Sequence, residues 1–388
     1  MKVAHQIRAF EQIVESYDGL LPLHRFLVTY YKKNKKMGSS DRRWATRYVY
    51  SFFRLGKALM PESQVQRLAI ADFLCNDTPS LVIENYLPGL QEQVNLPVQA
   101  KITLIKDRYP DFDLAAVFPF PADLLSESID PEAFYLSFFT QPDLFIRAQK
   151  NHAPKLLNSL QAAGVTAHEL SETTFAMPNG TKLENILPEQ KYYQVQDLSS
   201  QKTGAFFQPQ AHDYWWDCCA ASGGKSLLLH DLQPKIELLV TDVRENSLRN
   251  LDERFEAAGL KKYQKKVLDL LQNNEQALHH YTFDGIILDA PCSGSGTWGR
   301  TPEMLSFFEE HKISFFNNLQ QQIAANVIPY LKPGKPLIYI TCSVFKQENE
   351  KVVEYLQEAF GLTLESTAVI KGYGDKADTM FVARLLKP

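Results

Sequence analysis

The sequence comprises 388 residues, of which 45% are hydrophobic and 22% charged, a composition typical of soluble globular proteins. This length allows two or three domains, and no run of about 18 apolar residues predicts a membrane span. Five cysteines occur without a CxxC or Cys/His cluster, which excludes zinc sites of the usual spacing and favours reduced thiols. The N-terminus is amphipathic rather than a secretory signal, so we expect a cytoplasmic protein.

Positive charge is concentrated at the N-terminus. The whole chain has a net charge of −4, yet residues 1–60 contain twelve lysines and arginines against four acids, a net charge of +8. The remaining residues therefore carry −12. This asymmetry favours a module that contacts phosphate, although a solvated basic helix surface explains the charge equally well.

Residues 1–118 are predicted to form an all-helical domain, which the segment FPFPAD ends. The segment SSDRRWATRYVYSFFRL starts at a Ser/Asp cap, and its large apolar residues share one helical face: Trp44, Tyr48, Phe52 and Leu55. Positive charges occupy the positions between them. We therefore expect these aromatic rings to form a core rather than to stack on bases.

Residues 119–200 are predicted to form a small α+β domain of the ferredoxin or RNA-recognition-motif kind. A short strand (LFIRA) precedes a helix (APKLLNSLQAAG), and two alternating stretches (VTAHEL, TTFAM) follow it.

From residue 201 to 388 the pattern becomes strand, helix, strand. Five short apolar runs read as strands buried on both faces, and helical segments separate most of them. Such an alternation predicts a doubly wound, Rossmann-like α/β domain with a parallel sheet. The predicted strands cover residues 214–220, 236–243, 265–270, 283–290 and 335–343.

The first predicted strand turns into a loop of small residues, DCCAASGGKS. Gly223 and Gly224 allow a ligand to approach the backbone, although the loop matches neither GxGxxG nor a phosphate-binding loop. Asp242 ends the second strand, where a carboxylate can accept both ribose hydroxyls of a nucleoside cofactor or, alternatively, only cap the next helix. Asp269 ends the third strand and is placed to face an adenine amino group.

Two cysteines follow the fourth and fifth predicted strands. Cys292 comes directly after Pro291, and Cys342 lies in ITCSVF. Because adjacent parallel strands end at one edge of the sheet, we expect both thiols in one cleft beside the small-residue loop. Cys75 and at least one of Cys218 and Cys219 are expected in the core.

These segments carry a resemblance. DCCAASGGK, DAPCSGSG and TCS with ENE downstream resemble the motifs of the Sun (Fmu, RsmB-type) family of RNA 5-methylcytosine methyltransferases. The resemblance extends through QVQDLSSQ, and the basic N-terminus is similar to the NusB-like RNA-binding domain of the ribosomal RNA members. One departure is Ser222, where the family usually has proline, and another is Ser247, where arginine is frequent.

The resemblance implies a class I methyltransferase fold, S-adenosylmethionine as cofactor, and cytosine C5 in small-subunit ribosomal RNA as substrate. Transfer RNA is the alternative substrate. A non-catalytic RNA-binding or assembly factor with the same fold is the alternative class of function. We expect a monomer whose partner is RNA.

The resemblance also implies roles for individual residues. Spacing alone leaves both thiols as candidate nucleophiles; the family assigns Cys342 as the nucleophile and Cys292 as the thiol that assists release. Asp289 is expected to act at cytosine N3. Lys225 either lowers the pKa of a thiol or holds Asp289, or is only a solvated lysine at a helix start. The expected cofactor-binding residues are Cys219, Ala220, Ala221, Ser222, Gly223, Gly224, Lys225, Asp242, Asp269 and Asp289.

Three further polar residues lie near these motifs, and the sequence suggests a role for each. Arg300, in TWGRTPE, is expected to contact an RNA phosphate. Glu348 and Glu350 are explained by favourable charge at the N-terminal turn of a helix.

Overall fold

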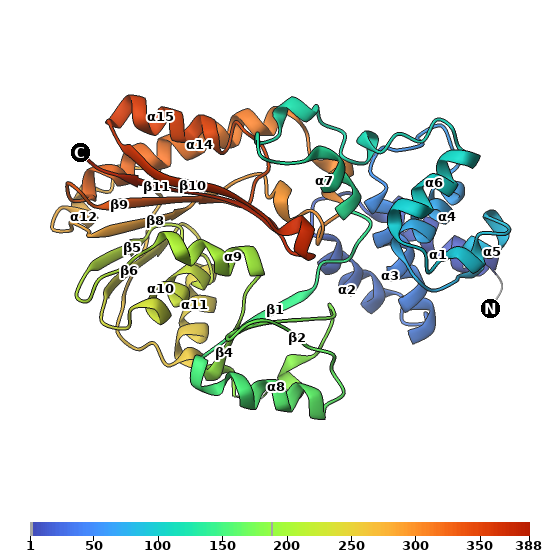
Figure 1. Ribbon diagram of the computed structural model, residues 1–388, viewed down its shortest axis with the longest axis horizontal. Helices are drawn as coiled ribbons and strands as arrows, with labels where there is room; N and C mark the ends of the chain where they lie inside the picture. Colours follow the sequence, from blue (N-terminus) through green and yellow to red (C-terminus); the bar gives the residue numbers. More distant parts are fainter. Residues whose placement is uncertain (1–2, 188) are drawn as a thin grey trace. The chain divides into compact units, whose positions relative to one another are not determined.

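The computed structural model describes residues 3–187 and 189–388 (Figure 1). Contacts divide the chain into two compact units. We call them the helical unit (Met1–Asp123, Asp130–Gln141, Thr297–Glu310) and the sheet unit (Leu124–Ile129, Pro142–Gly296, His311–Pro388). No helix among the described residues is long and apolar enough to cross a membrane.

The helical unit has a core of aromatic and aliphatic side chains. Tyr48 and Leu55 are fully buried and Phe52 nearly so, as the apolar stripe predicts, whereas Trp44 is only half-buried. Arg54 lies in this core and donates hydrogen bonds to three backbone carbonyls. The helices of the unit are α1 (Val3–Ser16), α2 (Leu23–Lys33), α3 (Ser39–Arg54), α4 (Gln64–Cys75), α5 (Leu81–Tyr86), α6 (Val98–Arg108), α7 (Pro131–Ser137) and α13 (Met304–Phe307).

A late segment of the chain completes the helical unit. Trp298 is 1% exposed and packs against Phe118, with ring centroids 5.7 Å apart. The Leu23 amide donates to the carboxylate of Glu303 at 2.9 Å, across 280 residues of sequence. Residues 297–310, which follow the PCSGSG motif, therefore belong to the core of the N-terminal helices.

The sheet unit is built on a seven-stranded sheet with the order β10-β11-β9-β8-β5-β6-β7. β6 and β7 lie on one side of β5, and β8 and β9 on the other, so the strand order reverses between β5 and β8. The five parallel strands are β5 (Tyr214–Asp217), β6 (Glu237–Asp242), β7 (Gln264–Val267), β8 (Gly285–Asp289) and β9 (Pro336–Thr341).

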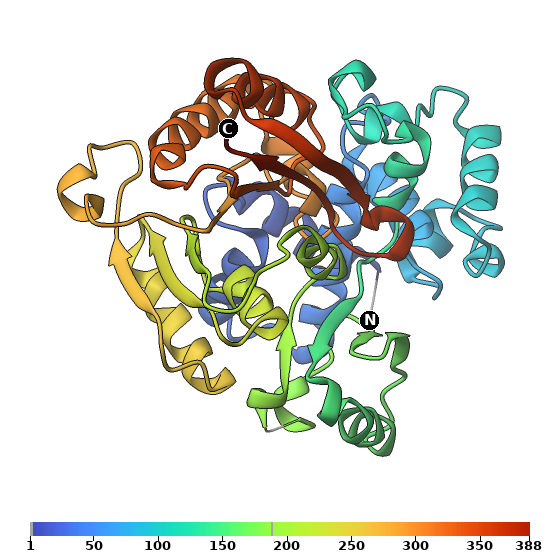
Figure 2. The same cartoon turned by 60° about the vertical axis from the view of Figure 1, so that its left-hand side comes forward.

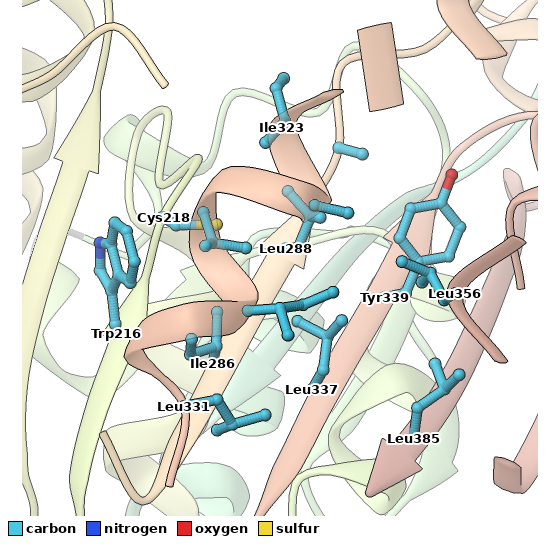
Figure 3. Packing of buried hydrophobic residues seen from close by; sticks show 14 of the residues in the cluster. Trp216, Cys218, Ile286, Leu288, Ile323, Leu331, Leu337, Tyr339, Leu356 and Leu385 are labelled. Atoms are coloured by element: carbon cyan, nitrogen blue, oxygen red, sulfur yellow. The ribbon is translucent and has the colours of Figure 1, made fainter. Parts of the chain in front are cut away.

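Helices cover both faces of this sheet, which is why its strands read as continuous apolar runs (Figure 1). One face packs against α14 (His311–Val327) and α15 (Glu350–Phe360), through a cluster that includes Trp216, Leu288 and Ile323 (Figure 3). The other face packs against α10 (Gly224–Leu232) and α11 (Glu245–Ala258). The short helix α12 (Glu275–Leu278) lies between β7 and β8 in the chain.

The C-terminal hairpin was not predicted. β10 (Thr363–Lys371) and β11 (Thr379–Leu386) pair antiparallel with each other, and β11 pairs antiparallel with β9. Figure 2 shows this hairpin in dark red beside the parallel strands. The expected parallel sheet is therefore a mixed sheet with two antiparallel strands at one edge.

A second, four-stranded sheet precedes the large one in the sequence. Its order is β2-β3-β1-β4, and every pairing is antiparallel. Helix α8 (Ala153–Ala162) buries Leu156 and Leu160 in the core of this small sheet. The strands are β1 (Leu144–Ala148), β2 (His168–Ser171), β3 (Thr174–Met177) and β4 (Tyr193–Val195), and α9 (Leu198–Lys202) follows them.

The predicted division at residues 118 and 200 stays a prediction. In the structure the small sheet belongs to the same unit as the seven-stranded sheet. Residues 130–141 and 297–310 belong to the unit of the N-terminal helices. Lys2, one of the twelve basic residues counted above, lies outside the described residues.

Candidate active site

The predicted site residues lie where the parallel strands end. Open α/β sheets bind ligands beyond the carboxyl ends of their strands, at the point where the strand order reverses. Here that point lies between β5 and β8. The small-residue loop follows β5, the segment with Cys292 follows β8, and Cys342 follows β9.

The loop after β5 is held tightly against its neighbours. Cys218 is 1% exposed and its thiol donates to the Ile287 carbonyl, whereas Cys219 is partly exposed. Gly223 has a φ of +79°, and a Cβ there would lie 2.3 Å from the Phe255 ring. Only glycine satisfies both conditions, which explains why the loop needs it at this position.

Asp242 links this loop to the end of β6. Its carboxylate accepts a hydrogen bond from the Ala221 amide at 3.0 Å and another from the Arg244 amide at 2.8 Å. The residue is 5% exposed. The cap interpretation and the ligand interpretation therefore both keep a structural basis, because the carboxylate orders the loop and also bonds the start of the next segment.

Asp217, at the end of β5, is a fully buried acid. One carboxylate oxygen accepts from the Ser226 hydroxyl at 2.6 Å, and the other has no hydrogen-bond partner among the described residues. Burial raises the pKa of Asp217 to about 7. Asp217 is not among the residues that the sequence predicted to bind the cofactor.

The sequence predicted that Asp269 ends the third strand, but in the structure this strand stops before it. β7 ends at Val267, and the Asp269 carboxylate accepts hydrogen bonds from the Leu271 amide at 3.0 Å and from Gln272 at 3.4 Å. The side chain thus bonds its own loop. The strand was extended too far because Leu268 and Leu270 continue the apolar pattern into the loop.

Lys225 and Asp289 form an ion pair at the end of β8. The ammonium nitrogen lies 3.0 Å from the Asp289 carboxylate and donates to the Ser200 hydroxyl at 2.9 Å. Lys225 is 7% exposed, so it is not a solvated lysine at a helix start. Ser200 comes from α9, within the QVQDLSSQ segment, and its contact with Lys225 was not foreseen.

The two predicted thiols lie together. The sulfur atoms of Cys292 and Cys342 are 3.3 Å apart, and both residues are partly exposed. The hydrogen bond with Cys342, together with burial, raises the pKa of Cys292 well above its ordinary value. The raised pKa favours the protonated form of Cys292.

Backbone contacts bring the two cysteine loops together. The Gly296 amide donates to the Cys342 carbonyl at 2.8 Å, and the Val344 amide donates to the Ser295 hydroxyl at 2.9 Å. A Cβ on Gly296 would lie 2.0 Å from the Thr379 carbonyl oxygen. The small residues of PCSGSG thus serve the close approach of the two loops.

Ser222 has a contact of its own. The Arg254 guanidinium, on α11, donates to the Ser222 hydroxyl at 3.3 Å, to the Val195 carbonyl and to Gln194 of β4. The Arg254 side chain thus connects the loop after β5 to the small sheet. No pattern in the sequence indicated Arg254.

A cavity of about 1090 Å³ lies on another side of α9. Leu198, Gln201 and Lys202 of α9 line it, whereas Ser200 of the same helix contacts Lys225. Its other charged lining residues are Asp143, Arg147, Lys150, Asp231, Asp375 and Lys376. None of the predicted catalytic residues lines this cavity.

Comparison with known sequences points to one group of enzymes. A model of the family "16S rRNA methyltransferase RsmB/F" matches residues 205–386. Ribosomal RNA small subunit methyltransferase B of Enterobacter sp. (strain 638) is 30% identical over 271 residues, which are 64% of this chain and 60% of that protein. The corresponding protein of Salmonella arizonae is 30% identical over 264 residues, with the same coverage. The chain thus spans 60% of the length of these curated relatives.

Comparison with solved structures shows a shared fold. The protein PH0851 covers 98% of this chain with a TM-score of 0.70 at 21% identity, and 98% of its own chain is matched. NSun6 from Pyrococcus horikoshii, solved with SFG, covers 70% of this chain and 99% of its own, with a TM-score of 0.61 at 17% identity.

The Rossmann-like sheet, with its loop after β5 and its acid at the end of β6, has the fold of these solved structures, and the similar sequences with a named activity are methyltransferases. Residues 205–386 are similar to the RsmB/F family of 16S rRNA methyltransferases.

The residues at the strand ends fit S-adenosylmethionine chemically. S-adenosylmethionine carries a sulfonium, an ammonium group and two ribose hydroxyls, all of which acidic groups bind well. The unpaired buried oxygen of Asp217 and the carboxylate of Asp242 lie at the ends of adjacent strands. No cluster of metal-binding side chains occurs among the described residues.

Proposed function

We propose that this protein methylates C5 of a cytosine in RNA, with small-subunit ribosomal RNA as the substrate. The main support is the pair of thiols 3.3 Å apart at the ends of β8 and β9. In the proposed reaction one thiol adds to the base, and the second can assist its departure. The similar proteins are named ribosomal RNA small subunit methyltransferase B, which supports ribosomal RNA as the substrate.

Cytosine C5 is too weak a nucleophile to react directly with a methyl donor. In the proposed mechanism the Cys342 thiolate adds to C6, the electron pair of the C5–C6 double bond forms a C4–C5 double bond, and the C4–N3 pair moves to N3, which takes up a proton from water. C5 thereby becomes the nucleophilic carbon of an enamine. Asp289, held by Lys225 at 3.0 Å, accepts a hydrogen bond from protonated N3 and favours this addition. S-adenosylmethionine, when bound, supplies the electrophilic methyl group.

Release reverses the addition. A base removes the C5 proton, the C5–C6 double bond forms again, and Cys342 leaves as a thiolate. Cys292 keeps its proton, since its pKa is raised, and its S–H group stabilises the departing thiolate 3.3 Å away. The assignment of Cys342 as nucleophile rests on the resemblance of its TCS motif to the family motif.

Two cysteine variants test this mechanism. Cys342→Ala is expected to abolish both methyl transfer and any covalent RNA adduct. Cys292→Ala is expected to methylate once and then accumulate an adduct, seen as a slow band on a denaturing gel. Cys75→Ala, a thiol on α4 of the helical unit, is the matched control and should turn over normally.

The outcome also decides between alternatives. An adduct with Cys342→Ala but none with Cys292→Ala would make Cys292 the nucleophile. Full turnover in both would eliminate the covalent mechanism. Bisulfite sequencing of RNA from a strain that lacks the protein identifies the substrate: loss of a 5-methylcytosine from transfer RNA would replace ribosomal RNA, and no loss would favour a non-catalytic RNA-binding or assembly factor.

A further inference from the structure

A buried acid lies behind the two thiols. Glu348 is fully buried and is not part of a helix, so the expected role in a helix N-terminal turn does not apply to it. One of its carboxyl oxygens accepts from the Ser293 amide at 2.8 Å, and the other lies 2.7 Å from the Ser343 hydroxyl. Ser293 follows Cys292 in the chain, and Ser343 follows Cys342.

The residue on the other side of Cys292 is held through the same carboxyl. The Gln320 amide nitrogen, on α14, donates to the Pro291 carbonyl at 3.0 Å and to Glu348 at 3.2 Å. Both neighbours of Cys292 are thus fixed, one directly by Glu348 and one through Gln320.

The chain around Glu348 is itself fixed. The Tyr339 hydroxyl donates to the Glu348 carbonyl at 2.6 Å. Asn349 bonds the Thr341 hydroxyl at 2.6 Å and the Ser343 carbonyl at 2.9 Å. The carboxyl group therefore has little freedom to follow a movement of either cysteine loop.

We propose that Glu348 is a positioning residue for the two-thiol reaction, whose carboxyl group holds the Cys292 loop and the Cys342 loop at a fixed separation. This inference rests on the proposed function for its catalytic meaning, while the geometric claim concerns the thiols alone. Glu348 does not touch the reacting atoms; it acts through Ser293 and Ser343.

The charge state of the carboxyl matters for this role. Burial raises the pKa of Glu348, which favours the neutral acid. The Ser343 hydroxyl donates to one carboxyl oxygen and the Ser293 amide donates to the other. Because a hydroxyl can also accept, a neutral amide at this position keeps both contacts and does not repel a thiolate. Glutamine, which is permanently neutral and has the same shape, should therefore replace it.

The catalytic test compares Glu348→Ala with Glu348→Gln. We expect Glu348→Ala to lower kcat by more than about tenfold with KM for RNA and S-adenosylmethionine within about twofold, and to accumulate adduct as Cys292→Ala does. Glu348→Gln should stay within about threefold of wild type. The matched control is Glu350→Ala, since that carboxyl bonds Ser126 at 2.9 Å and neither thiol loop.

A second measurement does not depend on methyl transfer. Diamide takes two electrons and two protons from a pair of thiols, which join as a disulfide while diamide becomes the hydrazine. The rate at which Cys292 and Cys342 join in the full chain, mapped by mass spectrometry, should fall more than about fivefold in Glu348→Ala and remain unchanged in Glu348→Gln.

Three results would overturn the proposal: equal oxidation rates in wild type and Glu348→Ala, normal turnover by Glu348→Ala, or a Glu348→Gln variant as impaired as Glu348→Ala. If Glu348→Ala does not fold, Gln320→Met removes one arm of the same contact and is expected to slow oxidation in the same direction. Failure of cytosine methylation in wild type with a slowed oxidation in Glu348→Ala would contradict the proposed function and leave the positioning role intact.

Discussion

Cys292 and Cys342 follow neighbouring strands in the same way, yet their surroundings differ. Cys292 lies between two residues whose backbone groups bond Gln320 and Glu348, whereas the carbonyl of Cys342 accepts from the Gly296 amide. The two identical side chains thus have different backbone contacts around them, and we propose different roles for them.

Substitution of Asp242 is the most direct test of the proposed cofactor site, because it should lower affinity for S-adenosylmethionine. Asp242→Ala removes the proposed ribose acceptor and the bond to the Ala221 amide, so we expect affinity for S-adenosylmethionine to fall more than about tenfold, equivalent to about 1.4 kcal/mol. Isothermal titration calorimetry measures this change.

Arg244→Ala is the matched control for Asp242. The Arg244 side chain is 65% exposed and contacts Asp242 at 3.2 Å, so its removal leaves the carboxylate in place. Affinity should remain within about twofold of wild type. Unchanged binding by Asp242→Ala would remove this residue from the cofactor site.

At the scale of elements, buried strands were predictable and the edge strands were not. β5, β6, β8 and β9 are apolar on both faces, so each appears as an uninterrupted run. β10 is half exposed along its length and contains polar residues, and a 3₁₀ turn rather than a two-residue turn joins it to β11. Neither strand therefore had the usual hairpin signal.

The site shows the same limit. The sequence predicted that Cys292, Cys342 and Asp289 share one edge of the sheet, because the carboxyl ends of parallel strands meet at the same edge. The direction of a loop side chain depends on its partners. Asp269 bonds its own loop and Glu348 is buried behind the thiols, and neither outcome follows from spacing.

The last turn of α2 and the loop that follows it form the most concentrated basic segment of the N-terminal helices. Lys32, Lys33, Lys35 and Lys36 are all exposed, whereas Arg54 is buried and Arg47 pairs with Asp72. The net charge of residues 1–60 thus overstates the number of groups available to RNA phosphates.

Charge reversal tests this loop. Lys35→Glu with Lys36→Glu should weaken RNA binding and flatten its salt dependence, because each phosphate contact contributes a slope of about 0.7 to 0.9. Lys261→Glu with Lys262→Glu makes the same charge change in another exposed loop and should have a smaller effect. Equal losses in filter-binding titrations would assign the effect to net charge alone.

At the scale of the whole molecule, the N-terminal helices are not a removable module. Trp298 and Leu305, from residues 297–310, are buried in the helical unit, and Arg54 donates to the Gly299 carbonyl at 2.7 Å. A truncation at residue 118 would expose these apolar side chains and leave the carbonyl without this donor.

Deletion of residues 1–118 should therefore lower the Tm by several degrees or cause aggregation, apart from any effect on RNA binding. Thermal unfolding followed by circular dichroism measures the change, and the Lys35→Glu, Lys36→Glu variant is the control that should keep the wild-type Tm. A truncated chain that unfolds at the wild-type temperature would show that residues 297–310 do not depend on the N-terminal helices.

The hydrogen bond between the Leu23 amide and Glu303 also bears on the order of folding during synthesis. The two residues are 280 positions apart, so at about 5 to 20 residues per second the ribosome needs roughly 15 to 60 s to produce the second after the first. During that interval the N-terminal helices have left the ribosome without Trp298, Leu305 and the carboxylate of Glu303. These helices therefore complete their core only after residues 298–305 have been synthesised, and until then their apolar surface stays exposed and prone to aggregation.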